Sequence, residues 1–214
     1  MSLDRLADLL LLLVLLTGFL ILGTTRLTTC IRGVAAQGAL IGALPLVLQP
    51  HWTAHTVGLA TGTIAIKAVV LPWFLTWAIR EAAVRREVEP RVGYLASMAL
   101  GVAAVAAASA VAARLPIPGE HSHLLVATSL SGVIMGLLVL ATRAKALIQV
   151  VGYLMLENGI YIFGLTSLDR VPFLVEIGVL LDVFVGVFIM GIVVFHINRE
   201  FDSLDSARLS ELKD

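Results

Sequence analysis

Three ionisable residues, Lys67, Glu157 and Asp182, each occupy the middle of an apolar run long enough to cross a bilayer. A charge at the centre of a membrane helix costs about 2.5–3.5 kcal/mol even on the lenient insertion scale. Such residues persist mostly where they line a polar pathway or satisfy one another. Their common depth predicts a lateral row of titratable sites, which is chemistry suited to moving protons in the plane of the membrane.

Glu157 has hydrogen-bonding candidates on its own helix. Tyr153 and Tyr161 lie four residues before and after it, so helical spacing puts both phenols on its face. Burial disfavours the charged form of a carboxyl and a nearby cation favours it, and a balance between the two allows proton exchange. The alternative is a permanently protonated glutamic acid that ties two helices together.

Lys67 is followed five residues later by Pro72. Proline has no N–H to donate and crowds the carbonyl four residues earlier, so the helix is expected to bend or loosen beside the lysine. A carbonyl freed in this way can bind an ammonium group or water. The alternative, a lysine snorkelling to the interface, is harder to reconcile with its central depth.

Asp182 has Gly178 and Gly186 four residues to either side, and small residues at that spacing let another helix approach closely. The carboxyl is therefore expected to face protein rather than lipid. Glu176 lies near the outer end of the same run, where it either marks an exit or reaches headgroup water. His196 ends the run at the other interface, as a proton acceptor or, more simply, as an ordinary capping residue.

The elements that carry these residues are membrane helices. Of the 214 residues, 59% are hydrophobic and only 14% are charged, and mean hydropathy is +0.98. A soluble domain usually carries about a quarter charged residues, so the sequence predicts an all-α, polytopic membrane protein without barrel strands. The expected spans are 6–22, 31–48, 56–79, 92–113, 124–141, 147–168 and 171–195.

Orientation follows from the basic residues, because Lys and Arg accumulate in cytoplasmic loops. Threading seven spans leaves only Arg5, Arg114 and Arg170 on one side. The sequence therefore predicts an N-terminus outside and a C-terminus in the cytoplasm. The basic residues on the cytoplasmic side would be Arg26, Arg32, Arg80, Arg85, Arg86, Arg91, Arg143, Lys145, Arg199, Arg208 and Lys213.

Other chemistries have little support in the sequence. There is no catalytic constellation, no phosphate-binding glycine loop and no Cys/His cluster with metal-ligand spacing. His121 and His123 are explained by a surface loop more simply than by a metal. The formal net charge is zero, which gives no reason to expect a nucleic-acid partner.

Blocks of this sequence are similar to a known family. They lie at 26–28, 65–72, 149–159, 174–182 and 204–213, and the most specific parts are the Glu-Asn-Gly that begins at Glu157 and the Val-Glu-Ile-Gly around Glu176. On these blocks the chain resembles the hydrogenase-4 component E family, a membrane subunit of group 4 nickel–iron hydrogenase and formate hydrogenlyase complexes.

The last three helices also look like the small three-helix membrane subunit of respiratory complex I and of multisubunit cation/proton antiporters. That resemblance divides the chain into an N-terminal four-helix region (1–120), a three-helix module (121–198) and a polar cytoplasmic tail (199–214). It implies two buried acids on consecutive helices in a membrane-plane pathway. Glu157 matches the first, and Asp182 competes with Glu176 for the second.

The same resemblance implies the setting of the chain. Its partners would be other membrane-arm subunits and cytoplasmic hydrogenase subunits, and the membrane would be the cell (inner or plasma) membrane. The nickel–iron centre and iron–sulfur clusters would belong to those partners, with no cofactor in this chain. Two alternatives stay open, a subunit of a cation/proton antiporter and a scaffold whose buried charges only pair helices. The tail is either solvated or a docking strip.

Overall fold

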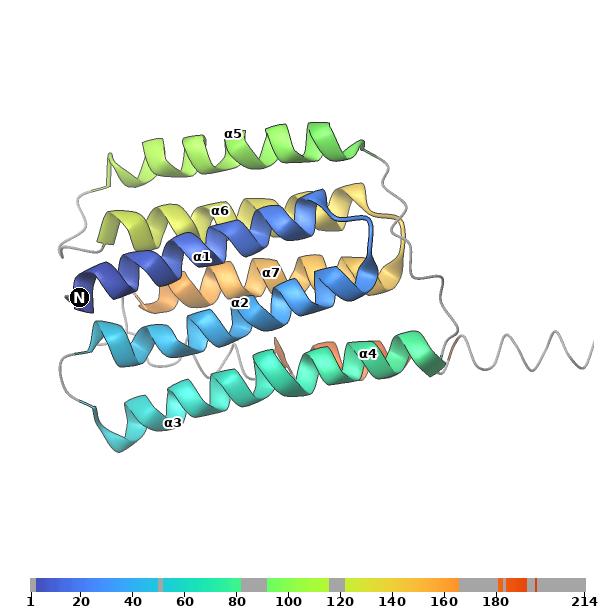
Figure 1. Ribbon diagram of the computed structural model, residues 1–214, viewed down its shortest axis with the longest axis horizontal. Helices are drawn as coiled ribbons and strands as arrows, with labels where there is room; N and C mark the ends of the chain where they lie inside the picture. Colours follow the sequence, from blue (N-terminus) through green and yellow to red (C-terminus); the bar gives the residue numbers. More distant parts are fainter. Residues whose placement is uncertain are drawn as a thin grey trace, which may run out of the picture.

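The computed structural model describes residues 3–49, 52–81, 92–115, 122–165, 181–182, 184–191 and 195. The elements of this part of the chain are all helices, with no β-strand, as the sequence predicts (Figure 1). Its elements are α1 (Leu3–Gly23), α2 (Leu27–Leu48), α3 (Ala54–Thr63), η1 (Ile64–Val70), α4 (Leu71–Glu81), α5 (Tyr94–Ala112), α6 (Ser122–Thr142) and α7 (Ala146–Leu165).

Six helices in the described ranges are long and apolar enough to cross a membrane, which makes the chain a membrane protein. Each matches one of the predicted spans to within a few residues. The third is continuous from Thr56 to Arg80 because α3, η1 and α4 follow one another without a break. Of the seventh predicted span, the structure describes 181–182, 184–191 and 195, which are helical. Orientation in the membrane stays a prediction.

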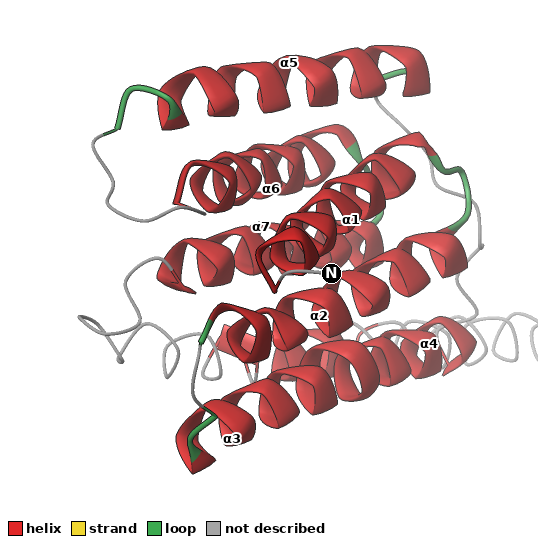
Figure 2. Ribbon diagram, turned by 60° about the vertical axis from the view of Figure 1, so that its left-hand side comes forward, coloured by secondary structure: helices red, strands yellow, loops and turns green. Residues whose placement is uncertain are grey.

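The helices form an antiparallel bundle in which consecutive membrane spans run in opposite directions (Figures 1 and 2). In the view of Figure 1, α5 covers one side, α1 and α6 follow, then α2 and α7, and the α3–η1–α4 helix lies on the other side. α2 is central, because it contacts α1, α3, η1, α4 and α7. The predicted boundary at residue 120 falls between α5 and α6, which pack against each other.

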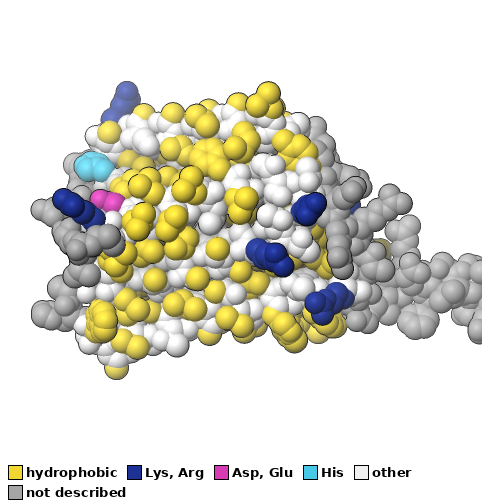
Figure 3. Space-filling model, viewed as in Figure 1, with side chains coloured by type: hydrophobic (Ala, Val, Ile, Leu, Met, Phe, Trp, Pro, Cys, Tyr) yellow, Lys and Arg dark blue, Asp and Glu magenta, His cyan; other side chains and the backbone are white. Residues whose placement is uncertain are grey.

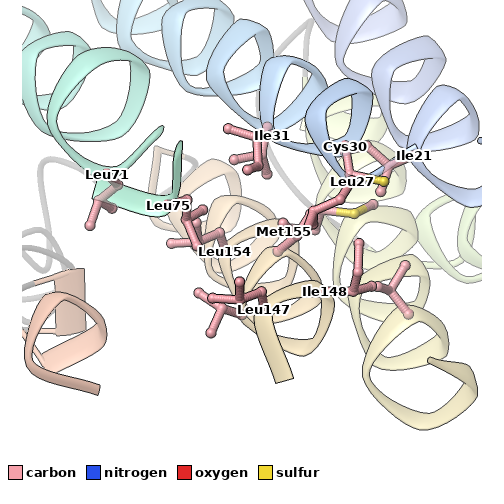
Figure 4. Packing of buried hydrophobic residues seen from close by; sticks show 14 of the residues in the cluster. Ile21, Leu27, Cys30, Ile31, Leu71, Leu75, Leu147, Ile148, Leu154 and Met155 are labelled. Atoms are coloured by element: carbon pink, nitrogen blue, oxygen red, sulfur yellow. The ribbon is translucent and has the colours of Figure 1, made fainter. Parts of the chain in front are cut away.

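The exterior and the interior of the bundle are both apolar. Figure 3 shows hydrophobic side chains spread along the length of the helices, and large ones such as Leu16 and Val102 are about 60% exposed. Lipid tails require such a surface, so burial of apolar area does not favour one helix neighbour over another. Inside, Leu75 of α4 lies beside Leu154 of α7, in a closely packed core (Figure 4).

Glycines bring α6 and α7 into backbone contact. A Cβ atom on Gly136 would lie 2.5 Å from the Leu156 nitrogen and 2.7 Å from the Gly152 oxygen, so no larger residue fits without separating the helices. Gly159 makes the same kind of approach, since its Cβ would lie 2.7 Å from the Val133 nitrogen. This contact fixes the rotation of α7 and leaves its other face to α2 and to the residues described next.

Candidate proton-transfer site

A buried ion triplet joins the three residues that the sequence places at one depth. The Nζ atom of Lys67 lies 2.8 Å from Oε1 of Glu157 and 2.9 Å from Oδ1 of Asp182. The three residues are only 5%, 2% and 3% exposed. The lysine therefore does not snorkel, and Asp182 faces protein as expected. The structure brings the three together, while their role in proton transfer stays a prediction.

Lys67 is carried by the π-helical segment η1, which ends two residues before Pro72. The N–H of Leu71 donates to the carbonyl of Ile66, five residues back instead of four. The loosening predicted from Pro72 is thus confirmed, and it takes the form of a wider helical turn. π-Helical turns occur frequently at functional sites. Here the ammonium of Lys67 contacts carboxylates, and not a freed carbonyl.

Glycines of α2 hold η1 in place. A Cβ atom on Gly38 would lie 2.8 Å from the backbone carbon and the Cβ of Lys67, and one on Gly42 would lie 2.5 Å from Cγ1 of Ile64. The widened turn therefore sits directly against the backbone of α2. Because Gly38 meets the backbone of Lys67 itself, the direction in which Lys67 leaves η1 is set by packing as well as by its charge.

The two tyrosines on the face of Glu157 do not bond its carboxyl. Tyr161 is buried, and its hydroxyl lies 3.3 Å from Oγ1 of Thr63, in a hydrogen bond between α7 and α3. Tyr153 is half-buried and packs against the apolar core. Among the described residues Oε2 of Glu157 has no hydrogen-bond partner. The expected pair of phenols around the carboxyl is therefore not formed, and Lys67 is instead the partner of its Oε1 atom.

A second buried polar cluster begins one residue further along α7. Nδ2 of Asn158 donates to Oε1 of Gln37 on α2 at 3.0 Å, and Nε2 of Gln37 donates to the carbonyl of Val14 on α1 at 3.3 Å. Both amide residues are at most 3% exposed. Sequence reasoning missed Gln37 as a site residue, although an uncharged amide in the middle of an apolar run is the signal that could have found it.

The amide pair supports a first prediction. Gln37→Leu is expected to lower the free energy of unfolding by about 1 kcal/mol or slightly more, because Nδ2 of Asn158 loses its partner while it stays buried. The measurement is denaturant unfolding in detergent. Adding Asn158→Leu should cost less than it costs in the wild-type background, since the partner is already gone. Strictly additive losses would show that the two amides do not interact.

Arg143 is a further residue whose role sequence reasoning missed. The sequence counts it only among the basic residues of the cytoplasmic side, and the structure shows it 1% exposed in the turn between α6 and α7. Its Nη2 donates to the carbonyl of Leu22 at 2.7 Å, and its guanidinium carbon lies 5.0 Å from the ring centroid of Tyr94. Burial lowers the pKa of this guanidinium from its usual value, and Tyr94 and Cys30 oppose that change. Arg143 thus ties the turn to α1 and α5.

Several predicted features lie outside the described residues, and one within them differs from the prediction. Glu176 and His196 lie outside the described residues, as do Gly178 and His121. Within the described part nothing lies within 4 Å of a Cβ placed on Gly186, so no described helix makes the close approach predicted there. No three His, Cys, Asp or Glu side chains of that part could together hold a metal ion.

Comparison with known proteins adds a nearly full-length relative and a partial match. The chain is 33% identical over 207 residues to the uncharacterized protein Rv0085 of Mycobacterium tuberculosis, covering 93% of this chain and 92% of that protein. It is 33% identical over 88 residues to hydrogenase-4 component E of Escherichia coli, a match that spans 41% of each chain. Hydrogenase-4 component E of Shigella flexneri matches to the same extent.

No protein-family model matches the chain, and no solved structure matches it significantly. The resemblance to hydrogenase-4 component E is thus supported over less than half of the sequence. The match to the mycobacterial protein covers almost all of it. The chain belongs to the same family of proteins as Rv0085 and shares part of its sequence with hydrogenase-4 component E.

Proposed function

We propose that the chain is a non-catalytic subunit in the membrane arm of a group 4 hydrogenase-type oxidoreductase complex, in the cell (inner or plasma) membrane. Its task would be to pass protons, or another cation, through the site formed by Lys67, Glu157 and Asp182. The observation that carries this proposal is the ion triplet, buried near the middle of the spans Thr56–Arg80 and Ala146–Leu165. The partial match to hydrogenase-4 component E supports the setting.

The charges of the triplet provide for a mobile proton. With all groups ionised, two carboxylates and one ammonium leave a net charge of −1 in a site that is almost fully buried. An uncompensated charge at that depth is expensive. One added proton makes the site neutral, and Oε2 of Glu157, which has no partner in the described part of the chain, is free to carry it. The triplet would thus hold one exchangeable proton between two acids.

Lys67 would act as the switch of this site. Its ammonium contacts both acids, so a shift of Nζ toward one of them leaves the other less stabilised and better able to bind the proton. A change in a neighbouring subunit that moves Lys67 by a small distance would then move the proton between Glu157 and Asp182. The wider turn of η1, at the base of the lysine, is the place where such a movement is easiest.

The partners supply the redox chemistry in this proposal. The nickel–iron centre and iron–sulfur clusters would belong to cytoplasmic hydrogenase subunits, and this chain would hold neither. The ammonium of Lys67 pairs with two carboxyls, and ammonium and carboxyl are both groups of proton chemistry. A cation/proton antiporter subunit would use the same triplet with no redox partner, and identification of the subunits that co-purify with the chain separates the two settings.

The functional test is Glu157→Gln in the complex isolated with its native partners and reconstituted in vesicles. Glutamine keeps the shape and can still accept from Lys67, but it cannot take up a proton. Electron transfer to a soluble dye should stay at the wild-type level, while the pH gradient formed during turnover is lost. Ile160→Ala, at a lipid-exposed position of the same helix, serves as the control and should keep both.

A scaffold is the second candidate, favoured by the fact that Lys67 joins three helical segments at once. It makes the opposite prediction for the same variant. If Lys67 only holds the helices together, Glu157→Gln will form the same pH gradient as the wild type. An intact gradient would therefore refute the transfer role and leave the structural one.

A further inference from the structure

A pocket with a mixed polar and apolar lining opens between α2 and α4, away from the ion triplet. Its volume is about 220 Å³. Six residues line it: Thr28, Ile31, Arg32, Thr76, Ile79 and Arg80. Two guanidinium groups therefore share one small cavity, which is unusual on a helix bundle whose surface is mostly apolar.

The two walls of the pocket have the same sequence pattern. Thr28, Ile31 and Arg32 on α2 are spaced Thr-x-x-Ile-Arg, and Thr76, Ile79 and Arg80 on α4 have that spacing again. In each helix the threonine and arginine are four residues apart, so they lie on one face. The two helices run antiparallel (Figure 1), which sets the arginine of one beside the threonine of the other.

The pocket lies at the end of the membrane spans. Arg32 is in the second turn of the span Leu27–Leu48, and Arg80 is the last residue of Thr56–Arg80. In Figure 3 dark blue side chains gather on the front face near that end of the bundle. Basic side chains at this depth are level with lipid headgroups, while Ile31 and Ile79 are buried and form the apolar part of the pocket lining.

Neither arginine is neutralised within the described part of the chain. Both arginines are exposed, and no ion pair joins either of them to another described residue. Thr76 donates its hydroxyl proton to the carbonyl of Pro72, so the donors that face the pocket are the two guanidiniums and Thr28. A guanidinium presents two parallel N–H donors, which match a phosphate or carboxylate group.

We infer that this pocket binds the phosphate group of an anionic phospholipid. The positive charge selects an anion, and the planar donors suit its phosphate oxygens. The position at the end of two membrane spans favours a lipid, since its acyl chains can lie along exposed apolar side chains of the third span, such as Val69 and Trp73, while its headgroup fills the pocket. Free phosphate in water would lack those apolar contacts.

The test uses the full chain in nanodiscs of phosphatidylcholine to which phosphatidylglycerol is added in steps. Native mass spectrometry counts the phosphatidylglycerol molecules that stay bound, and the thermal unfolding midpoint reports stabilisation. The double variant Arg32→Gln/Arg80→Gln is expected to bind phosphatidylglycerol about tenfold to thirtyfold more weakly than wild type. Arg114→Gln is the matched control, because Arg114 is exposed near the end of α5 and does not line the pocket.

Two further experiments complete the test. Arg32→Lys/Arg80→Lys keeps both positive charges and controls for misfolding of the glutamine variant. It should bind phosphatidylglycerol with intermediate affinity, because lysine lacks the paired donors. Inorganic phosphate, added to wild type in pure phosphatidylcholine, should give no stabilisation. Equal lipid binding by the wild type and the glutamine variant would overturn the inference. Stabilisation by inorganic phosphate alone, or by an acidic protein partner at this face and not by lipid, would also overturn it.

Discussion

Lys67→Met is expected to lower the free energy of unfolding by about 3–5 kcal/mol. The substitution removes the cation that faces two buried carboxyls, and methionine fills most of the space of the lysine stem. Glu157 and Asp182 would then face each other without compensation. Both must take up protons before the bundle can close, so the loss should be larger at high pH than at low pH.

The measurement is reversible unfolding of the purified chain in detergent, by circular dichroism over a series of denaturant concentrations. Lys67→Met/Glu157→Gln/Asp182→Asn, which removes all three charges, should recover most of the lost stability. Arg114→Met is the control for loss of one positive charge at an exposed position, and it should leave stability within about 0.5 kcal/mol of wild type. A Lys67→Met chain as stable as wild type would show that the ion triplet does not exist in solution.

Gly136→Val is expected to lower the free energy of unfolding by a similar amount. Gly136 belongs to α6 and contacts the face of α7 that is turned away from Lys67. The nearest neighbours of its Cβ would be the Leu156 nitrogen at 2.5 Å and the Gly152 oxygen at 2.7 Å, which are both backbone atoms. They cannot turn away as a side chain can, so α6 and α7 must separate. Overpacking of this kind costs about 3 kcal/mol, and here it would also displace Glu157 from Lys67.

Unfolding in detergent is again the measurement, and Gly62→Ala is the matched control. Gly62 is a helical glycine as well, but a Cβ there meets nothing within 4 Å. Its substitution by alanine should leave stability unchanged or raise it by about 0.5–1 kcal/mol, because alanine is the better helix former. If Gly136→Val were as stable as Gly62→Ala, the close contact between α6 and α7 would be wrong.

Sequence alone predicts the described part of the fold well because lipid leaves few choices. A long apolar run must be a helix, since its backbone groups can bond only to each other. The spans at Leu27–Leu48 and His123–Thr142 were accordingly predicted to within a few residues. The depth of Lys67 and Glu157 in the membrane follows from their positions within these predicted spans. Their contact does not, because hydropathy carries no information about which helices are neighbours.

The residues that sequence reasoning missed are those whose role depends on packing. Arg143 follows an apolar run, as a loop cation does, and only the folded turn shows that Leu22 and Tyr94 enclose it. Gln37 is a single amide among apolar residues, and its meaning appears only when Asn158 lies opposite. The expected bonds from Tyr153 and Tyr161 to Glu157 are not formed for the same reason, since its partner is a cation from another helix, which hydropathy does not reveal.

A π-helical segment such as η1 can arise when one residue is inserted into an α-helix and the contacts on either side are kept. Its hydrogen bonds reach back five residues and not four, so it holds one residue more than an α-helix that joins the same two neighbours. A relative that is α-helical throughout would be one residue shorter between Thr63 and Pro72. The partner of Glu157 in that relative must be found from its contacts, because counts from the two ends disagree by one.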